Sequence, residues 1–417
     1  MKQNKIINDI NGMIILNKPK DMTSNDCLSI IKKCIHPKKI GHTGTLDKNA
    51  TGVLICLLGS ATKSQDYLMK TCKKCYRAEL VLGISTDTED ITGNIIEQNT
   101  NKILDISDDE LKSTIESFIG EYSQVPPMYS AKKVNGTKLL KLARNGIEIE
   151  RKAELLTIHN IEIENIANYK YNNLNLKCVN IFVECSKGTY IRTLCKDIGI
   201  KLGIPACMGN LCRVASGEFE LEDSVTVDEL KEKISLNDWS FVKPCFYNND
   251  ETALTFGKFE TLHLGHLKII NEVVSYAKEN KLKSTVMIVG NNSDNEILTN
   301  AQRISKLKLL GVNNIVYFPL DKVNKNISAN DFITNILYKQ LKTRCIIVGS
   351  DCSFGAKASG NIKLLNDLCE SLNIKCKIIN KLKINNTDID ISSTYIKSEY
   401  LKGNKILVNK LLGKDYE

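Results

Sequence analysis

The chain has 417 residues and is 42% hydrophobic, enough to bury a large core and to form two or three domains. No apolar run is long enough to span a membrane and the first residues lack a signal-peptide core, so we expect a cytoplasmic protein that enters no membrane. The fifteen cysteines follow no repeating frame, as is typical of reduced cytosolic thiols. Only Cys72 and Cys75 have the spacing of metal ligands, and without a second pair we expect no metal site.

Charge is unevenly distributed along the chain. Residues 1–240 carry 32 basic and 31 acidic side chains, a net charge of +1, whereas residues 241–417 carry 25 and 17, a net charge of +8. A basic region of this kind suits a polyanion such as RNA. A general bias of the composition towards lysine is the alternative explanation.

The first 240 residues alternate short strands with isolated helices and are expected to form an α+β domain with a mixed or antiparallel sheet. Strands are predicted at residues 14–16, 76–82 and 179–185. Helices are predicted at residues 24–35, capped by Thr23 or Ser24, at 107–119, from Thr189 to Leu202, and at 226–234.

The second part has a regular alternation of strand and helix. Residues 241–252 show no period and are expected to link two domains, which occupy residues 1–240 and 253–417. The elements expected after the linker are strands at 253–257, 284–289, 314–318 and 344–349, and helices at 264–279, 301–310 and 329–341. Such an alternation predicts an α/β domain with a doubly wound parallel sheet.

One carboxylate, that of Asp47, lies in a turn rich in glycine and threonine, Gly41-His42-Thr43-Gly44-Thr45-Leu46-Asp47. The two glycines allow backbone angles that side chains forbid, so this turn can approach a ligand closely. Asp47 is therefore a candidate reacting group. An ordinary turn containing aspartate is the alternative.

Several further motifs occur in a fixed order with this turn. They are Leu16-Asn17-Lys18-Pro19, Gly59-Ser60-Ala61-Thr62-Lys63, Lys74-Cys75-Tyr76, Gly83 to Gly93, Pro126 to Ala131, Ala143-Arg144-Asn145-Gly146 and Cys185 to Arg192. Through them residues 12–230 resemble the catalytic domain of TruB-type tRNA pseudouridine-55 synthases. The resemblance implies isomerisation of one uridine in the T-loop of tRNA, without a metal or an organic cofactor.

The resemblance also implies a role for each residue of the site. Asp47 would react at the sugar, either as a covalent nucleophile or by removing a sugar proton, and Arg192 would orient it. Tyr76 would stack on the flipped base, Tyr190 would act near it as a hydroxyl group, and Leu211 would form apolar wall. The residues expected to contact RNA are His42, Lys18, Lys63 and Lys187. Taken singly, the tyrosines also fit ordinary strand aromatics and the lysines fit solvated side chains.

Two positions in this part depart from the family pattern. Lys48 follows Asp47 where the family usually has proline, which predicts a looser turn. Cys212 stands where the family usually has arginine, so one basic contact is missing. Neither change removes a reacting group, and we expect an active enzyme.

The chain lacks the small PUA domain that commonly ends relatives of this synthase. Residues 253–417 instead resemble the FAD synthetase (FMN adenylyltransferase) domain of bacterial bifunctional riboflavin kinase/FAD synthetases, and the kinase module is missing. The motifs are Gly257 to His266 with His263-Leu264-Gly265-His266, Val348 to Gly355, Ile391 to Lys397, and Leu411 to Tyr416. The resemblance implies ATP with Mg²⁺ and FMN as ligands. The residues that it assigns to the nucleotide are Gly257, His263, Gly265, His266, Asp351, Ser392, Ser393, Thr394 and Lys397.

Departures are more numerous in this part. Glu260 and Thr261 replace the usual Asp-Gly, and Lys397 stands in place of arginine. The segment Gly290 to Asp294 lacks an expected Pro-His-Pro element, and no basic residue closely follows Asp351. ATP binding is still expected, whereas complete FMN adenylylation is one of two alternatives.

Alternative functions follow from these observations. The chain could be an RNA-binding and folding protein whose catalysis is incidental. It could be bifunctional, with FAD synthesis in its second half. Alternatively, the basic second half could be a degenerate domain that replaces the PUA domain in tRNA binding.

Overall fold

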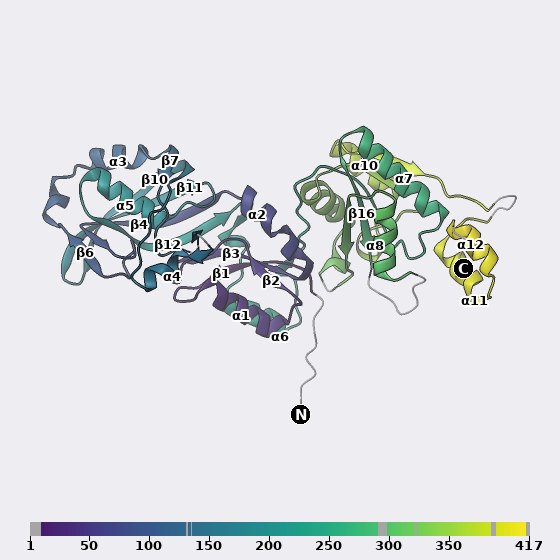
Figure 1. Cartoon of the computed structure of the whole chain (residues 1–417), viewed down its shortest axis with the longest axis horizontal. Helices are drawn as coiled ribbons and strands as arrows, with labels where there is room; N and C mark the ends of the chain where they lie inside the picture. The colour runs from purple at the N-terminus through teal and green to yellow at the C-terminus, as the bar shows by residue number, and fades with distance from the viewer. Residues whose placement is uncertain are drawn as a thin grey trace, which may run out of the picture.

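The computed structural model describes residues 10–413 apart from 131, 135, 291–297, 322 and 385–388. Figure 1 shows two lobes, each built around its own β-sheet. We call residues 10–243 the N-terminal half and residues 252–413 the C-terminal half. Three segments named from the sequence extend beyond the described residues, at Ala131, residues 291–294 and residues 414–416.

The N-terminal half contains a ten-stranded mixed sheet in which the main path runs β14-β1-β3-β12-β4-β11-β10-β7, with β2 beside β3 and β13 beside β12. All pairs are antiparallel except β3 with β12, which are parallel. The strands are β1 (Gly12–Lys18), β2 (Ile40–His42), β3 (Thr51–Leu58), β4 (Lys74–Leu82), β7 (Gly120–Gln124), β10 (Glu154–Tyr171), β11 (Leu174–Cys185), β12 (Ala206–Ser216), β13 (Phe219–Glu220) and β14 (Val242–Lys243). Two small hairpins accompany it, β5 (Ile84–Thr86) with β6 (Ile95–Gln98) and β8 (Lys133–Val134) with β9 (Thr137–Lys138).

Helices cover both faces of this sheet. The larger apolar core lies under α1 (Ser24–Ile35), α3 (Asp108–Glu116), α5 (Ile191–Leu202) and α6 (Val227–Ser235). A smaller core on the other face lies under the 3₁₀ helix η1 (Gly59–Ser64) and α2 (Gln65–Thr71). The remaining elements are α4 (Leu139–Arg144), η2 (Asn101–Asp105) and η3 (Leu221–Asp223).

The helix starts follow the capping signals in the sequence. Thr23 and Thr226 form capping boxes at α1 and α6, and Ser107 caps α3. The prediction that a helix opens at Thr189 is wrong by two residues, because Tyr190 is extended and its backbone N–H donates to Oε1 of Gln124 (2.8 Å). Helix α5 therefore begins at Ile191.

The C-terminal half contains a five-stranded sheet, entirely parallel, in the order β17-β16-β15-β18-β19. Its elements are β15 (Thr252–Gly257), α7 (Leu264–Glu279), β16 (Lys283–Val289), α8 (Asn300–Leu309), β17 (Asn314–Phe318), η4 (Asn324–Asn326), α9 (Ala329–Asp331), the π-helix η5 (Phe332–Gln340), β18 (Thr343–Gly349), η6 (Ala356–Ala358), α10 (Ile362–Ser371), β19 (Lys375–Ile379), α11 (Ser393–Leu401) and α12 (Lys405–Leu412). The predicted strand and helix order is confirmed. The helix expected at 329–341 is a short α-turn followed by the π-helix, and β19 was not predicted.

The connecting segment, residues 244–251, is bound to both halves. The side chain of Gln340 accepts from the N–H of Phe246 (2.6 Å) and donates to the carbonyl of Pro244 (3.3 Å). Tyr247 stacks on Tyr67 of α2, with ring centroids 5.5 Å apart. The segment therefore holds defined contacts although its sequence has no period.

Candidate active site

Asp47 lies in the loop between β2 and β3, and both of its neighbours are fixed by side chains from earlier in the chain. The hydroxyl of Ser24 accepts from the N–H of Leu46 (2.9 Å) and donates to its carbonyl (3.1 Å). The ammonium group of Lys18 donates to the carbonyl of Lys48 (3.2 Å). These contacts hold the backbone on either side of Asp47, so the looser turn predicted from Lys48 is offset by a hydrogen bond to its main chain.

The carboxylate of Asp47 faces the guanidinium of Arg192 in the first turn of α5. Nε of Arg192 lies 2.9 Å from Oδ2 of Asp47, and Nη2 lies 3.4 Å from Oδ1. The arginine also donates to the carbonyls of Thr88 (3.1 Å) and Tyr129 (3.0 Å). Its side chain is 6% exposed and that of Asp47 is 41% exposed. A rigid buried cation thus orients a carboxylate whose other side is open.

Tyr76 is buried on β4 close to this pair. Burial raises the pKa of its phenol, the charge and hydrogen bond of Arg213 lower it, and the charge of Asp47 raises it further. Arg213 lies opposite Tyr76 in the neighbouring strand β12, and Leu211, also buried, precedes it by two residues. The aromatic ring, the apolar side chain and the carboxylate therefore approach one another at one place in the sheet.

Tyr190 is positioned by its backbone at the start of α5. Its N–H and its carbonyl are both bound by the side-chain amide of Gln124, at 2.8 Å and 3.0 Å. The residue is half-buried. Because Arg192 follows two residues later, the same contact with β7 also positions the arginine backbone.

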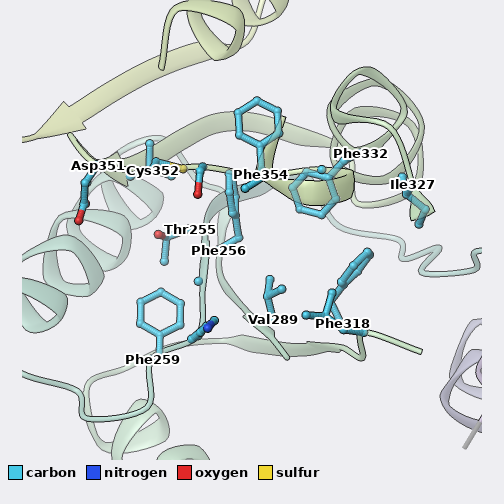
Figure 2. Close-up of a pocket in the computed structure, with 18 of the residues that line it drawn as sticks. Thr255, Phe256, Phe259, Val289, Phe318, Ile327, Phe332, Asp351, Cys352 and Phe354 are labelled. Carbon is cyan, nitrogen blue, oxygen red and sulfur yellow. The ribbon is translucent and has the colours of Figure 1, made fainter. Parts of the chain in front are cut away.

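The second candidate site is a cavity of about 670 Å³ in the C-terminal half. It lies at the carboxyl ends of β15, β16 and β18, and the chain order reverses between β15 and β18. Open parallel sheets bind their ligands at such a reversal. Figure 2 shows Asp351 and Cys352 on one side of the cavity and Ile327, Phe318 and Phe332 on the other.

Two histidines lie at the start of α7, beside this cavity. Their rings are stacked with centroids 3.7 Å apart, and Nδ1 of His263 accepts from the N–H of His266 (3.3 Å). Burial lowers the pKa of His263 to about 4 and that of His266 to about 3, where the charge of His263 also contributes. Nδ1 of His266 is buried without a hydrogen-bond partner, and His266 lines the cavity. Both imidazoles are therefore neutral near pH 7.

Gly265 is needed between these histidines because a β-carbon there would lie 3.0 Å from the ring of His263. Gly257 ends β15 and lines the cavity. Asp351 also lines it, and Nζ of Lys381 lies 3.2 Å from its Oδ2. A basic partner for Asp351 thus exists, thirty residues further along the chain.

Two side chains of α11 contact Glu260 and Thr261, which are residues that depart from the family pattern. Lys397 forms an ion pair with Glu260, and the hydroxyl of Ser393 lies 3.0 Å from that of Thr261. Ser392 caps α11 by accepting from the N–H of Tyr395 (3.2 Å), and Thr394 is exposed. Lys397 and Ser393 are therefore already engaged by the protein.

Three family models match the chain. TruB family pseudouridylate synthase (N terminal domain) matches residues 32–191, and tRNA pseudouridylate synthase B C-terminal domain matches residues 192–240. FAD synthetase matches residues 246–395. The tRNA pseudouridine synthase B of Alkaliphilus oremlandii is 50% identical over 222 residues, which cover 53% of this chain and 70% of that protein. The chain belongs to the TruB family of pseudouridylate synthases.

Other members of the TruB family give similar values. The tRNA pseudouridine synthase B of Bacillus subtilis is 45% identical over 53% of this chain and 70% of its own, and that of Clostridium acetobutylicum is 44% identical over 62% and 86%. Among solved structures, an H/ACA RNP bound to a substrate RNA containing 2′-deoxyuridine matches with 24% identity and a TM-score of 0.40. That match covers 56% of this chain and 59% of the other.

Within the TruB part, the structure brings together Asp47, Arg192 and Tyr76, with Leu211 nearby. The direct RNA contact expected of Lys18 stays a prediction, and the structure shows another role for its side chain. Its side chain is fully buried, and its ammonium group donates to the carbonyls of Pro19 (2.9 Å), Met22 (2.5 Å) and Lys48 (3.2 Å). No proton of that group remains for a phosphate.

The other basic residues differ in exposure. Lys63 in η1 and Lys187 in the turn after β11 are exposed, so both are open to a polyanion. His42 in β2 is half-buried, and burial, followed by the charge of Arg213, lowers its pKa. A neutral His42 offers RNA a hydrogen bond rather than a charge.

The sequence analysis missed Ser24 and Arg213. A serine at a helix start reads as a cap, and nothing local shows that Ser24 binds Leu46 instead. The sequence could have indicated Arg213, because residues two apart in a strand lie on the same face and Arg213 follows Leu211 by two.

No helix among the described residues is long and apolar enough to cross a membrane. In the same part of the chain, no group of three His, Cys, Asp or Glu side chains is arranged to hold a metal ion.

Proposed function

We propose that this chain converts a uridine in the T-loop of tRNA to pseudouridine, with Asp47 as the reacting group. The paired geometry of Asp47 and Arg192, beside the buried ring of Tyr76, carries the proposal. The names of the TruB relatives support tRNA as the substrate. Since tRNA is found there, we further propose that the protein acts in the cytoplasm.

The reaction is an exchange of bonds on one ring. The bond from N1 of uracil to C1′ of the ribose breaks, a bond from C5 to C1′ forms, and the hydrogen of C5 is replaced by one on N1. Electrons balance without an oxidant or reductant, so no cofactor is required. A carboxylate beside the ribose assists either as a nucleophile at C1′ or as a base for a sugar proton.

The protein's part is to bind the flipped nucleotide and to hold Asp47 at its ribose. Tyr76 supplies a ring on which the base stacks, Leu211 supplies apolar wall, and Tyr190 supplies a hydroxyl. Arg192 keeps the carboxylate oriented through its fork. Lys63, Lys187 and His42 would contact the RNA around the target.

The test uses a tRNA transcript labelled with tritium at C5 of uridine, because isomerisation releases that hydrogen to water. Wild type releases tritium and Asp47→Asn does not, although the variant still binds tRNA. Asp66→Asn, at an acid on the exposed surface of α2, is the matched control and keeps full activity. Release that survives in Asp47→Asn would rule out this assignment, and no release by wild type would favour the RNA-folding alternative.

For the second half we propose a nucleotidyltransferase-like domain that binds ATP with Mg²⁺ and adenylylates FMN. The domains would comprise residues 1–240 and 253–417 with a linker at 241–252. The proposal is supported by the FAD synthetase match, the parallel sheet and the cavity at its switch point. The aromatic walls suit a flavin ring, and the imidazoles at the start of α7 suit phosphate.

In this reaction the phosphate of FMN attacks the α-phosphorus of ATP, and pyrophosphate leaves. His263, His266 and the N-terminus of α7 would donate hydrogen bonds to the phosphates. Asp351, Gly257 and Gly265 would shape the site, and Ser392, Ser393, Thr394 and Lys397 would reach the triphosphate once Lys397 leaves Glu260. FAD formation from ATP and FMN, lost in His263→Ala and unchanged in Asp47→Asn, tests the proposal.

A second candidate for this half is tRNA binding, favoured by the net charge of +8 on residues 241–417 and by the contacts of this half with the linker. A protein ending at residue 251 keeps the packing of Cys245 and Tyr247 on the N-terminal half. If this candidate is correct, that protein binds tRNA more weakly and with a shallower dependence on salt, while its rate on saturating tRNA is unchanged.

A further inference from the structure

Arg213 on β12 is 1% exposed, which places it among the largest fully buried side chains of the protein. Its Nε donates to the carbonyl of Val53 (2.7 Å), and its Nη2 donates to the carbonyl of Gly44 (3.2 Å). It lies opposite Tyr76 in the neighbouring strand β4, and its charge opposes the rise that burial causes in the pKa of the Tyr76 phenol. One guanidinium thus binds β3 and the turn that carries Asp47, beside Tyr76 of β4.

The charge of Arg213 is unusual for a structural contact. Among the described residues no carboxylate pairs with it, and its nearest ionisable neighbours include Lys74 and His42, whose pKa values burial and Arg213 lower. A buried unpaired cation is costly, and an apolar side chain of similar length would fill the same space. The cost is explained if the planar guanidinium group holds the surrounding backbone in a geometry that an apolar side chain could not hold.

The backbone around Arg213 is built for close approach. Gly52 in β3 has a φ of +100°, and a β-carbon there would lie 2.3 Å from the carbonyl oxygen of Arg213. Gly44 has a φ of +104°, and a β-carbon there would lie 3.6 Å from Nη1 of Arg213. Gly52 therefore lets β3 lie against the backbone of Arg213, and the positive φ of Gly44 favours glycine in the Asp47 loop.

We propose that Arg213 is a positioning residue of the isomerisation, which sets the place of the Asp47 turn relative to the ring of Tyr76. This inference rests on the proposed function of Asp47 and Tyr76. Gly44, whose carbonyl Arg213 binds, precedes Asp47 by three residues, and Tyr76 lies opposite Arg213 in the sheet. When the base stacks on Tyr76, the fork therefore determines where the ribose meets the carboxylate. Lysine cannot replace it, because an ammonium group lacks the planar guanidinium geometry that binds the carbonyls of Val53 and Gly44 from two different nitrogens.

The test compares Arg213→Lys with wild type on unmodified tRNA. We expect kcat to fall about 10- to 100-fold, as for a misplacement on the order of an ångström, while KM stays within about threefold of wild type. Arg77→Lys is the matched control, because Arg77 is on β4 with its side chain 61% exposed and paired with Glu164. Its kcat should be unchanged.

Two further variants separate positioning from stability. Ile55→Ala leaves a cavity in the smaller core and destabilises the domain without touching the site. It should keep kcat when assayed well below its melting temperature. Tyr76→Phe removes only the hydroxyl of the residue opposite Arg213. If the two residues act together, the fall in kcat of the double variant with Arg213→Lys should be smaller than the product of the two single falls.

The proposal is overturned if Arg213→Lys keeps kcat, or loses no more of it than Ile55→Ala does at equal stability. If Arg213→Lys does not fold, Tyr76→Phe decides, since an unchanged kcat in that variant also overturns the proposal. Failure of the proposed function itself looks different, because wild type would then release no tritium and Asp47→Asn would not differ from it.

Discussion

The Asp47 site and the C-terminal cavity differ in how their unusual residues act. In the first, Lys48 departs from the family pattern, yet its contact to Lys18 is made by a backbone carbonyl that any residue supplies. In the second, Glu260 and Thr261 contact the helix α11 through their side chains. A departure that acts through the backbone leaves a site intact, whereas one that acts through side chains changes which charges are available.

The compensation within the second site is specific. Glu260 and Lys397 both differ from the family residues, and they pair with each other. The ion pair joins the loop after β15 to α11 and neutralises the cation of Lys397, which we propose reaches the triphosphate.

The largest fall in activity is expected from a variant that disrupts the Asp47 site. Arg192→Met removes the fork from Asp47 and leaves the carbonyls of Thr88 and Tyr129 without their donor. We expect kcat for tritium release to fall about 10²- to 10³-fold, in the range found when one preorganised electrostatic contact is lost. Arg77→Met, at an exposed arginine, is the control and should keep its rate. A fall of less than about threefold in Arg192→Met would contradict the role of the pair.

Lys18→Met tests whether the backbone contacts hold the Asp47 turn. Three carbonyls lose a charged donor, which should cost about 2–3 kcal/mol of unfolding free energy. Because the turn is then less fixed, kcat should fall on the order of tenfold. Urea unfolding and tritium release measure the two effects. Lys20→Met, at an exposed lysine bonded to Asn210, should change neither, and an RNA-contact role for Lys18 would appear instead as a raised KM alone.

Glu260→Gln tests the neutralised charge in the second site. Removing the acid frees Lys397 for phosphate, so ATP should bind roughly 3- to 10-fold more tightly, which corresponds to about 1 kcal/mol. Equilibrium binding of a fluorescent ATP analogue measures it. Glu272→Gln, which breaks a similar ion pair with Lys377 on the surface, is the matched control. Equal binding in wild type and Glu260→Gln would show that the pair does not restrict the nucleotide.

The smallest expected effect is a change of stability with pH, which follows from the lowered pKa values of His263 and His266. Their pKa values, about 4 and about 3, lie below the ordinary value near 6.5, so below pH 6.5 the unfolded chain binds more protons than the folded one. Their contribution to stability is complete above pH 6.5 and is lost as the pH falls towards 4. Hydrogen exchange of the strand at residues 252–257 should therefore quicken between pH 7 and 5, after correction for the intrinsic rate. His266→Asn should reduce this change, and an unchanged profile would contradict it.

Much of the fold was predictable because the signals are local. Capping residues such as Thr23, Ser107 and Thr226 predict where helices start. The alternation of apolar and polar residues in β4 predicts a strand with one buried face. The strand and helix order of the C-terminal half follows from the same periodicities. The start of α5 was misplaced because Gln124, from β7, holds Tyr190 extended.

Site residues were predictable in type but not always in role. Lys18 was expected to contact RNA, and its burial depends on three carbonyls that only the folded loop brings together. Arg213 was missed, since its hydrogen-bond partners come from β3 and the Asp47 turn, both far from it in sequence. The pair of Glu260 with Lys397 spans 137 residues, so neither position alone reveals it.

The sequence by itself determined the likeness to two families, the alternation of strands and helices from β15 to β18, and Asp47 and Arg192 as charged candidates, because these depend on residue type and spacing along the chain. Only the tertiary structure decided which charges are paired, which lysine is buried and which arginine binds the turn that carries Asp47. The physical reason is that pairing and desolvation depend on distances between segments far apart in sequence, and those distances exist only after the sheets and helices have packed.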